Sequence, residues 1–489
     1  MASLNELNSW HSDWQGLRVA VIGLGVTGFS AADTLAELGC EVTVFAQKAE
    51  AEFLDILDVL GVEHVTGEAA AELPPALVEF APELIVTSPG VRPNSPIIEW
   101  AVSQGIPVWV DIELAWRLRD KTDRVAQWVL ITGTNGKTTT TQLVTEMLRS
   151  AGHRVAACGN IGTPILDCVR EPEGFDYLVV EVSSFQLHYL GFVSPVASAI
   201  LNIDQDHIDW HGTFDSYVAA KAKVYANTQV AAIFNVADAV TIKALEEAEV
   251  VEGCRAIGFT VGTPGLSMVG FVEEILCDRA FVEDRANTAQ EIATLEDLSE
   301  IGVVTPHLMA NVAAATALAR ACDVTPTQIR EAIRSFRLDK HRIELVAFKD
   351  DIAWVDDSKA TNPHATAASL ASFEHVVWLV GGLLKGVDIT PLVEKFASRL
   401  RGAVVIGVDR EPVLAALESV APHVPVIEIN VDDKNQVMTQ AVSAAANLAQ
   451  AGDTVLLAPA SASMDQFKDY ADRGTQFANA VRHHLEGAN

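Results

Sequence analysis

The stretch VLITGTNGKTT at residues 129–139 decides how the rest of the chain is interpreted. Its apolar first half predicts a buried strand, and a helix is expected to begin near Thr138. The glycine-rich segment between them offers backbone N–H groups that can cradle phosphates, while Lys137 can neutralise the outer phosphates and Thr138 can ligate Mg²⁺. We therefore predict a nucleotide-phosphate site made by Gly133, Thr134, Asn135, Gly136, Lys137, Thr138 and Thr139.

This loop departs from the common GxxxxGK[ST] spacing, because Ile131 stands where the first glycine would be. The alternative interpretation is a capped helix start that carries an incidental lysine. The order of strand, loop and helix favours the phosphate site.

The same alternation of apolar strands and helical stretches runs through the whole chain, which indicates α/β folding around mainly parallel sheets. Polar breaks at 119–124 and 337–342 divide the chain into three domains of ordinary size, which we place at 1–121, 122–338 and 339–489. The expected strands are 17–23, 40–45, 128–132, 177–182, 197–203, 352–356, 376–380, 403–408 and 454–458, and the clearest helices are 28–38 and 138–151.

The chain has 489 residues with 34 Lys+Arg against 65 Asp+Glu, a formal net charge of −31. Such an excess of acids argues against nucleic acid or an anionic membrane leaflet as a partner. No apolar run approaches the roughly 20 residues of a membrane span, and no secretion signal is visible at the N-terminus. Six cysteines without a CxxC pair fit a reducing cytoplasm. The acidic stretch 246–300 is weakly patterned, so we expect it to be irregular.

A second glycine loop, Gly23-x-Gly25-x-x-Gly28, follows the first expected strand and opens the first expected helix. Such a loop lets the backbone approach a pyrophosphate, which the helix N-terminus then holds. NAD binding also needs an acid at the end of the second strand, where this chain reads VFAQK at 44–48. Binding of another nucleotide is therefore favoured over NAD, and a purely structural tight turn stays open.

Polar side chains are expected at the ligand edge of the central sheet. Glu181 ends one strand, where an acid can hold Mg²⁺ that is bound to phosphates. His207 follows the next strand, and the two strand ends point toward one phosphate loop. The alternatives are a surface acid and a structural histidine. Lys221 lies in a helical stretch, where a solvated helix face is the ordinary expectation for lysine.

Three polar loops follow apolar strands in the last third of the chain. Strand-to-helix loops at one edge of a parallel sheet indicate a binding surface. Ordinary capping of helix N-termini by Ser and Asp is the alternative for each loop. The loops belong to the segments WVDDSKATNP at 354–363, LVGGLLKG at 379–386 and LLAPASASMDQFKDYADRG at 456–474.

Together these residues resemble the Mur ligases, the ATP-dependent amide-forming enzymes of peptidoglycan precursor synthesis. The resemblance spans the whole chain, and its last two motifs are similar to the members that add D-glutamate. The matching motifs are IGLGVTG at 22–28, TSPGV at 87–91, TGTNGKTT at 132–139, GNIG at 159–162, EVSSFQL at 181–187, DHIDWHG at 206–212, AAKAKVY at 219–225, DDSKATNP at 356–363 and SMDQFKDYADRG at 463–474.

The resemblance implies three α/β domains: a Rossmann-like N-terminal domain for the UDP substrate, a P-loop ATPase-like central domain for ATP, and a Rossmann-like C-terminal domain for the amino acid. The implied reaction begins with attack of the UDP-N-acetylmuramoyl-L-alanine carboxylate on ATP, with Mg²⁺. The amine of D-glutamate then displaces phosphate from the acyl phosphate. We expect a monomeric cytoplasmic enzyme.

The resemblance also implies roles for individual residues. The implied catalytic residues are Lys137, Glu181, His207 and Lys221. The implied Mg²⁺ ligands are Thr138, Glu181, His207 and Lys221, the last as a carbamate. ATP contacts outside the phosphate loop are implied for Asn311, Arg342 and Asp357. Substrate contacts are implied for Val26, Thr27, Ser88, Gly90, Asn160, Lys359, Thr361, Lys385, Ser463, Met464 and Tyr470.

Two positions depart from the family pattern. Leu308 replaces the first of two asparagines that commonly contact adenine, which leaves only Asn311. Ala46 replaces an acid that some members use for uracil, so uracil recognition is expected to shift toward the backbone near Val26 and Thr27. An NAD-linked oxidoreductase, an ATP-hydrolysing switch and a relative that adds a diamino acid stay as alternative functions.

Overall fold

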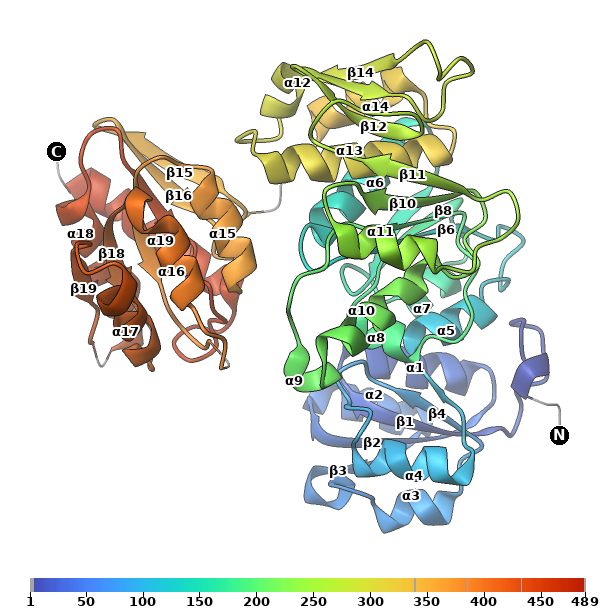
Figure 1. Ribbon diagram of the computed structural model, residues 1–489. Helices are drawn as coiled ribbons and strands as arrows, with labels where there is room; N and C mark the ends of the chain where they lie inside the picture. Colours follow the sequence, from blue (N-terminus) through green and yellow to red (C-terminus); the bar gives the residue numbers. More distant parts are fainter. Residues whose placement is uncertain (1–3, 338–339, 385, 432, 488–489) are drawn as a thin grey trace. The chain divides into compact units, whose positions relative to one another are not determined.

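The computed structural model describes residues 4–337, 340–384, 386–431 and 433–487. The strands form three separate sheets of five, nine and six strands (Figure 1). The chain divides into two compact units: Met1–Leu298 with Leu308–Phe336 contain the first two sheets, and Ser299–His307 with Arg337–Asn489 contain the third. The predicted α/β fold on mainly parallel sheets is confirmed.

The first sheet is parallel throughout and has the strand order β3-β2-β1-β4-β5. Because the chain moves to opposite sides of β1, the loop after β1 lies where a ligand crevice forms in such sheets. The strands are β1 (Arg18–Leu24), β2 (Glu41–Ala49), β3 (Glu63–Thr66), β4 (Leu84–Thr87) and β5 (Val108–Trp109). The helices are α1 (Val26–Glu37), α2 (Ala51–Leu60), α3 (Pro75–Phe80), α4 (Pro96–Gln104) and α5 (Asp111–Arg117).

The second sheet has the order β14-β13-β12-β11-β10-β9-β6-β8-β7, and its strands from β7 to β12 in this order are parallel. Those strands are β6 (Gln127–Thr132), β7 (Val155–Gly159), β8 (Tyr177–Glu181), β9 (Ala197–Ile200), β10 (Ala231–Asn235), β11 (Arg255–Phe259) and β12 (Met268–Val272). The helices are α6 (Lys137–Ser150), α7 (Ile165–Arg170), α8 (Ser184–Tyr189), α9 (Ile208–His211), α10 (Phe214–Ala222), α11 (Ala239–Glu246), α12 (Leu295–Ser299), α13 (Pro306–Ala321) and α14 (Pro326–Ser335).

The expectation that residues 246–300 are irregular is wrong. The stretch contains β11, β12, β13 (Ile275–Asp278), β14 (Gln290–Thr294) and α12, and β12 to β14 form an antiparallel meander. The turn between β12 and β13 consists of Glu273 and Glu274, and Glu273 has φ +53°. Two-residue hairpin turns usually carry Asn or Gly. Two acids at the turn, and strands of only four or five residues, concealed the hairpin in the sequence.

The third sheet has the order β15-β16-β20-β17-β18-β19, and only β15 runs antiparallel to its neighbour among these strands. Its strands are β15 (Glu344–Lys349), β16 (Ile352–Asp356), β17 (Val376–Val380), β18 (Leu400–Val405), β19 (Val426–Glu428) and β20 (Thr454–Leu457). The helices are α15 (Pro363–Ala371), α16 (Thr390–Phe396), α17 (Glu411–Val420), α18 (Val437–Leu448) and α19 (Tyr470–Gly487).

The predicted domain boundaries stay predictions. The boundary at 121/122 lies in a turn region between α5 and β6. The boundary at 338/339 falls outside the described residues. Within the described ranges, no helix combines the length and the apolar character needed to cross a membrane.

Gly381, directly after β17, lies where two backbone segments pack closely. Its φ is +120°, and a Cβ atom there would lie 2.0 Å from the carbonyl oxygen of Ile406. We expect Gly381→Ala to destabilise the protein by about 2–4 kcal/mol, because steric overpacking adds to left-handed strain. The midpoint of thermal unfolding measures this loss.

Gly452 provides a matched control, since it has φ +91° and no atom would lie within 4 Å of its Cβ. Gly452→Ala therefore adds only the backbone strain of about 1–2 kcal/mol. Equal losses of unfolding free energy in the two variants would contradict a steric clash between the new Cβ atom at position 381 and the Ile406 carbonyl.

Candidate active site

The loop after β1 explains two of its three glycines by packing alone. A Cβ on Gly23 would lie 2.6 Å from Ser88 Oγ, and one on Gly28 would lie 2.1 Å from the Gly23 carbonyl oxygen. Gly25 has open space around it, and Val26 beside it is 60% exposed. A tight turn thus accounts for Gly23 and Gly28. Gly25 and the first turn of α1, which contains Thr27, are accessible to a ligand.

The loop between β6 and α6 has its shape fixed by Asn202, which follows β9. The backbone N–H of Asn135 donates to Asn202 Oδ1 (2.8 Å), and Asn202 Nδ2 donates to the Asn135 carbonyl (3.1 Å). The Thr134 N–H donates to the Asn202 carbonyl (2.9 Å). At the helix cap, Gly136 has φ +83°, and a Cβ there would lie 2.4 Å from Asn311 Oδ1. Asn311 on α13 therefore lies against the phosphate loop.

Two lysines meet at one carbonyl of this loop. Lys137 Nζ donates to the carbonyls of Gly133 (2.8 Å) and Thr134 (2.9 Å), and Lys221 Nζ donates to the same Gly133 carbonyl (2.8 Å). Lys221 is only 2% exposed, so the expectation of a solvated helix face is wrong. Burial, together with the charge of Lys137, lowers the pKa of Lys221 well below its ordinary value.

Glu181, the last residue of β8, is buried beside the loop after β7. Asn160 Nδ2 donates to Glu181 Oε1 (2.9 Å), and the Asn160 N–H donates to the Glu181 carbonyl (2.8 Å). The other carboxylate oxygen, Oε2, is buried and has no hydrogen-bond partner among the described residues. Thr138 is half-buried in the first turn of α6, and Thr139 behind it is buried. The alternative interpretation of Glu181 as a surface acid is wrong, because the side chain is buried.

His207 is held in a left-handed backbone conformation with φ +53°, at the N-cap of α9. Its ring packs edge-on against Phe185, with centroids 4.7 Å apart. Burial lowers the pKa of His207, and the charges of Lys137 and Lys221 lower it further. A neutral imidazole, the form that binds metals, is thereby favoured near pH 7.

The loop after β4 contacts the helices that carry these residues. Trp210 Nε1 on α9 donates to the Gly90 carbonyl (3.4 Å), and the Tyr189 hydroxyl on α8 donates to the Val91 carbonyl (2.8 Å). Arg92 pairs with Asp209 at 2.9 Å. The crevice of the first sheet, with Ser88 and Gly90, therefore adjoins the central site within one compact unit.

In the third sheet, one buried arginine joins two of the three predicted loops. Arg473 on α19 is fully buried. Its Nε and Nη2 donate to the hydroxyl (2.9 Å) and carbonyl (2.8 Å) of Ser358, and its Nη1 donates to the Ser461 carbonyl (3.2 Å). The Ser358 hydroxyl in turn donates to the Tyr470 carbonyl (2.7 Å). Burial lowers the pKa of Arg473 to about 10, so it stays charged at neutral pH.

The remaining predicted amino-acid contacts lie on these same loops. Lys359 Nζ sits 3.7 Å from the ring centroid of Tyr470, a cation–π contact. Ser463 is buried, Thr361 is half-buried, and Met464 is 67% exposed. Lys385 lies outside the described residues.

Asp357 is buried, and both of its carboxylate oxygens have donors. The Ser369 hydroxyl donates to Oδ2, and the Ile343 N–H donates to Oδ1 (3.3 Å). Burial raises the pKa of Asp357 to about 6, although the nearby charge of Arg342 opposes this shift. These contacts join Asp357 to the chain entering the third sheet, and its role toward a nucleotide stays a prediction.

His341 fixes the same entering segment. Its Nδ1 lies 2.6 Å from Asp356 Oδ2, and its N–H donates to Glu344 Oε2 (2.9 Å). The bond to Asp356 raises the pKa of His341. These three side chains are the one His/acid group in the described ranges compact enough for a cation, with ligand atoms within 4.8 Å of one another. A Cβ on Gly474 would lie 2.2 Å from His341 Nδ1, so the pair is tightly packed.

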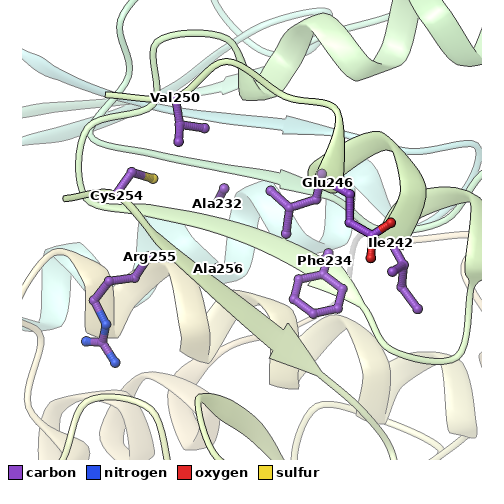
Figure 2. A pocket seen from close by; sticks show the side chains of 9 residues that line it. Ala232, Phe234, Ile242, Glu246, Val250, Cys254, Arg255 and Ala256 are labelled. Carbon is purple, nitrogen blue, oxygen red and sulfur yellow. The ribbon is translucent and has the colours of Figure 1, made fainter. Parts of the chain in front are cut away.

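A hollow of about 330 Å³ between α11 and strands β10 and β11 lies apart from these residues. Figure 2 shows Arg255 at one end of this hollow, and Ile242 and Glu246 at the other. Its walls are mostly apolar side chains, such as Phe234 and Val250. None of the predicted catalytic residues lines it, so we do not assign it to the active site.

Three family descriptions match successive parts of the chain. The Mur ligase MurD-like, N-terminal domain matches residues 17–110, the Mur ligase middle domain matches 131–319, and the Mur ligase, glutamate ligase domain matches 341–461. The chain belongs to the Mur ligase family. The matches agree with the motifs on which the resemblance was based, from the first glycine loop to the loop at Asp357.

Relatives of this Mur ligase match over nearly their full length. A protein of Leifsonia xyli named UDP-N-acetylmuramoylalanine--D-glutamate ligase is 56% identical over 99% of this chain and 96% of its own. A protein of the same name from Streptomyces avermitilis is 48% identical over 96% of this chain and 99% of its own.

Solved structures of the family share the fold. MurF from Acinetobacter baumannii aligns with a TM-score of 0.57 at 16% identity, covering 95% of this chain and 90% of its own. MurF from Thermotoga maritima, solved in complex with ADP, aligns with a TM-score of 0.54 at 17% identity, covering 100% of both chains. At such low identity the likeness shows the fold alone.

Three groups that position the candidate site of this Mur ligase were not predicted from the sequence. Asn202 could have been found, because it follows β9, the strand next to the phosphate loop, at the sheet edge where polar side chains meet. The burial of Arg473 could not be predicted from the sequence, because an arginine among polar residues is ordinarily exposed. The pair His341 and Asp356 joins residues 15 apart, which spacing alone does not indicate.

Proposed function

We propose that this Mur ligase uses ATP to join D-glutamate to UDP-N-acetylmuramoyl-L-alanine, in peptidoglycan precursor synthesis. One observation carries the proposal: Lys137 and Lys221 meet at the Gly133 carbonyl, in a chain 56% identical to a protein named for that reaction. The carboxylate of the muramoyl substrate attacks the γ-phosphate of ATP, which forms an acyl phosphate and releases ADP. The D-glutamate amine then attacks the acyl phosphate, and phosphate leaves.

The chain's own residues supply the charge that these steps require. The three substrates are anions, whereas the chain carries a net charge of −31. Because screening confines charge effects to about 8 Å, cations within the site must attract the substrates. Lys137 serves the ATP phosphates, with N–H groups of the loop that Asn202 holds. Arg342, Lys359 and Lys385 are the corresponding cations of the third domain.

Mg²⁺ fits the acid at the end of β8. Glu181 Oε2 is buried and has no hydrogen-bond partner in the described ranges, while Asn160 holds Oε1. A buried carboxylate oxygen without a donor is costly unless a cation lies opposite. When bound, Mg²⁺ supplies neutralisation of phosphate oxygens. We assign Glu181, His207 and the Thr138 hydroxyl as its ligands.

Lys221 is proposed to carry a carbamate. Its lowered pKa favours the neutral amine, the form that reacts with CO₂. The neutral amine nitrogen bonds to the carbon of CO₂ and releases one proton, so that an anion replaces the uncharged amine. The carbamate places an anion that attracts the ammonium of Lys137 and lies beside Glu181, where a metal ion can use it.

The amino acid site is proposed to lie on the loops joined by Arg473. Lys359 and Lys385 can pair with the two carboxylates of D-glutamate, and the hydroxyls of Thr361 and Ser463 can donate to them. We further propose that the enzyme works as a monomer in the cytoplasm, which accords with its six free cysteines. Val26, Thr27, Ser88 and Gly90 are assigned to the UDP part of the substrate.

A phosphate-release assay tests the proposal. With ATP, Mg²⁺ and UDP-N-acetylmuramoyl-L-alanine present, we expect phosphate release only when D-glutamate is added. L-Glutamate should give less than about one-hundredth of the rate, because inverting the α-centre moves the amine away from the acyl phosphate while the carboxylates stay bound.

Lysine and meso-diaminopimelate serve as comparison amino acids in the same assay. Release with a diamino acid, on a precursor that already contains glutamate, would contradict the assignment within the family. Release without any amino acid would favour an ATP-hydrolysing switch instead.

A further inference from the structure

A second hollow, of about 570 Å³, lies on the central sheet at the start of β11. Arg255, Arg285 and Arg320 line it, together with Phe281, Glu283 and Asp323. Three arginines at one hollow are unexpected in a chain whose net charge is −31. No residue assigned to catalysis or substrate binding lies among them.

Two of these arginines have no carboxylate partner in the described parts of the chain. Arg255 donates to the Ala280 carbonyl, and Arg285 Nη1 donates to Ser267 Oγ (3.0 Å). Burial lowers the pKa of Arg255, the nearby charge of Arg285 lowers it further, and the charge of Asp278 opposes these shifts. An anion that binds between the two guanidinium groups relieves the repulsion between them.

The third arginine makes the wall of the hollow rigid. Arg320 on α13 pairs with the fully buried Asp278 at 2.9 Å, and it also donates to the Phe281 carbonyl (3.1 Å). Asp278 in turn accepts from the N–H groups of Ala280 (2.7 Å) and Phe281 (2.9 Å). The guanidinium groups of Arg255 and Arg320 lie over the Phe281 ring, 5.0 Å and 6.0 Å from its centroid. The hollow is therefore formed before any ligand binds.

This hollow is separate from the phosphate loop. Arg255 is the first residue of β11, whereas the phosphate loop follows the last residue of β6, and all the strands between them are parallel. The two places thus lie at opposite edges of the sheet, about one strand length or roughly 16 Å apart. Arg255 also lies at one end of the hollow of Figure 2, so its side chain lines both hollows.

We propose that this hollow is a second anion site, in which Arg255 and Arg285 bind a small oxyanion such as a phosphate or carboxylate group. Glu283 and Asp323 at the same hollow exclude extended polyanions, so the ligand is compact. Fork-shaped guanidinium groups match the oxygens of phosphate and carboxylate in two-point contacts. The site stands independently of the ligase reaction proposed above.

Equilibrium dialysis of the full chain against radiolabelled inorganic phosphate tests this site. The background protein is the Lys137→Ala variant, saturated with Mg²⁺ and a non-hydrolysable ATP analogue. In this background, inorganic phosphate no longer binds at the phosphate loop between β6 and α6. We expect one phosphate per chain to remain bound. Arg255→Gln/Arg285→Gln in that background should weaken this binding at least tenfold, and Arg285→Gln alone, at an exposed side chain, should weaken it measurably.

Arg124→Gln/Lys243→Gln is the control with matched charge, since both side chains lie elsewhere on the same unit. Its phosphate affinity should equal that of the background protein. Succinate that displaces the phosphate identifies a site open to carboxylates, and succinate that does not displace it identifies a phosphoryl site. Absence of the bound phosphate, or equal affinities in the arginine and control variants, would overturn the proposal.

Discussion

Lys137→Ala is expected to lower turnover by about 10²–10³-fold. The ammonium group of Lys137 lies on the phosphate loop, where its positive charge stabilises the negative charge that develops on the transferring phosphate. Two unit charges about 4 Å apart interact by roughly 4 kcal/mol at an effective dielectric constant of 20, and a loss of that size reduces a rate by this amount. The measurement is the rate of phosphate release at saturating ATP, muramoyl substrate and D-glutamate.

Lys243→Ala controls for the loss of one positive charge. Lys243 is 73% exposed on α11 and pairs with Glu247 at 3.8 Å, so its removal should leave turnover within about twofold. Turnover of the Lys137→Ala variant close to that of this control would mean that ATP does not bind at the loop after β6.

Lys221→Ala is expected to be almost inactive, and small carboxylic acids such as formate should restore part of the activity. The substitution removes the carbamate proposed beside Glu181, and a free carboxylate can fill the vacated anion position. In the intact enzyme equilibrated with ¹³CO₂, a carbamate carbon should appear in the NMR spectrum. This signal should be absent in Lys221→Ala.

Lys223→Ala provides the control for this signal, because Lys223 lies two residues away and donates to the carbonyls of His188 and Leu190 rather than to the phosphate loop. The variant should retain the carbamate signal. A free amine at Lys221 in fully active, CO₂-equilibrated enzyme would remove the carbamate from the proposal.

Much of the fold could be predicted because parallel strands buried on both faces give continuous apolar runs. The expected strands at 352–356 and 376–380 match β16 and β17 residue for residue. The meander of β12 to β14 could not be predicted, because its strands are short and its first turn consists of Glu273 and Glu274. Long-range pairing, and not local pattern, makes these segments strands.

In the candidate site, too, some residues could be predicted from the sequence and others could not. Lys137 and Glu181 stand at strand or helix ends, so topology alone placed them at one edge. The burial of Lys221 could not be predicted, since its helix has the same sequence pattern whether its lysine faces solvent or the Gly133 carbonyl. The links made by Asn202 and Arg473 are hydrogen bonds to backbone carbonyls and amides, which leave no mark on residue spacing.

Arg473 has a consequence for how the amino acid site that we propose on these loops can evolve. Because one guanidinium holds Ser358 and Ser461 together, a substitution that shifts one loop also displaces the other. The effects of substitutions in the two loops should therefore be strongly epistatic, whereas distant substitutions usually combine independently. A lineage that acquires a new amino acid substrate would need to exchange the loops as a linked set, and single-residue paths between specificities would pass through poorly active intermediates.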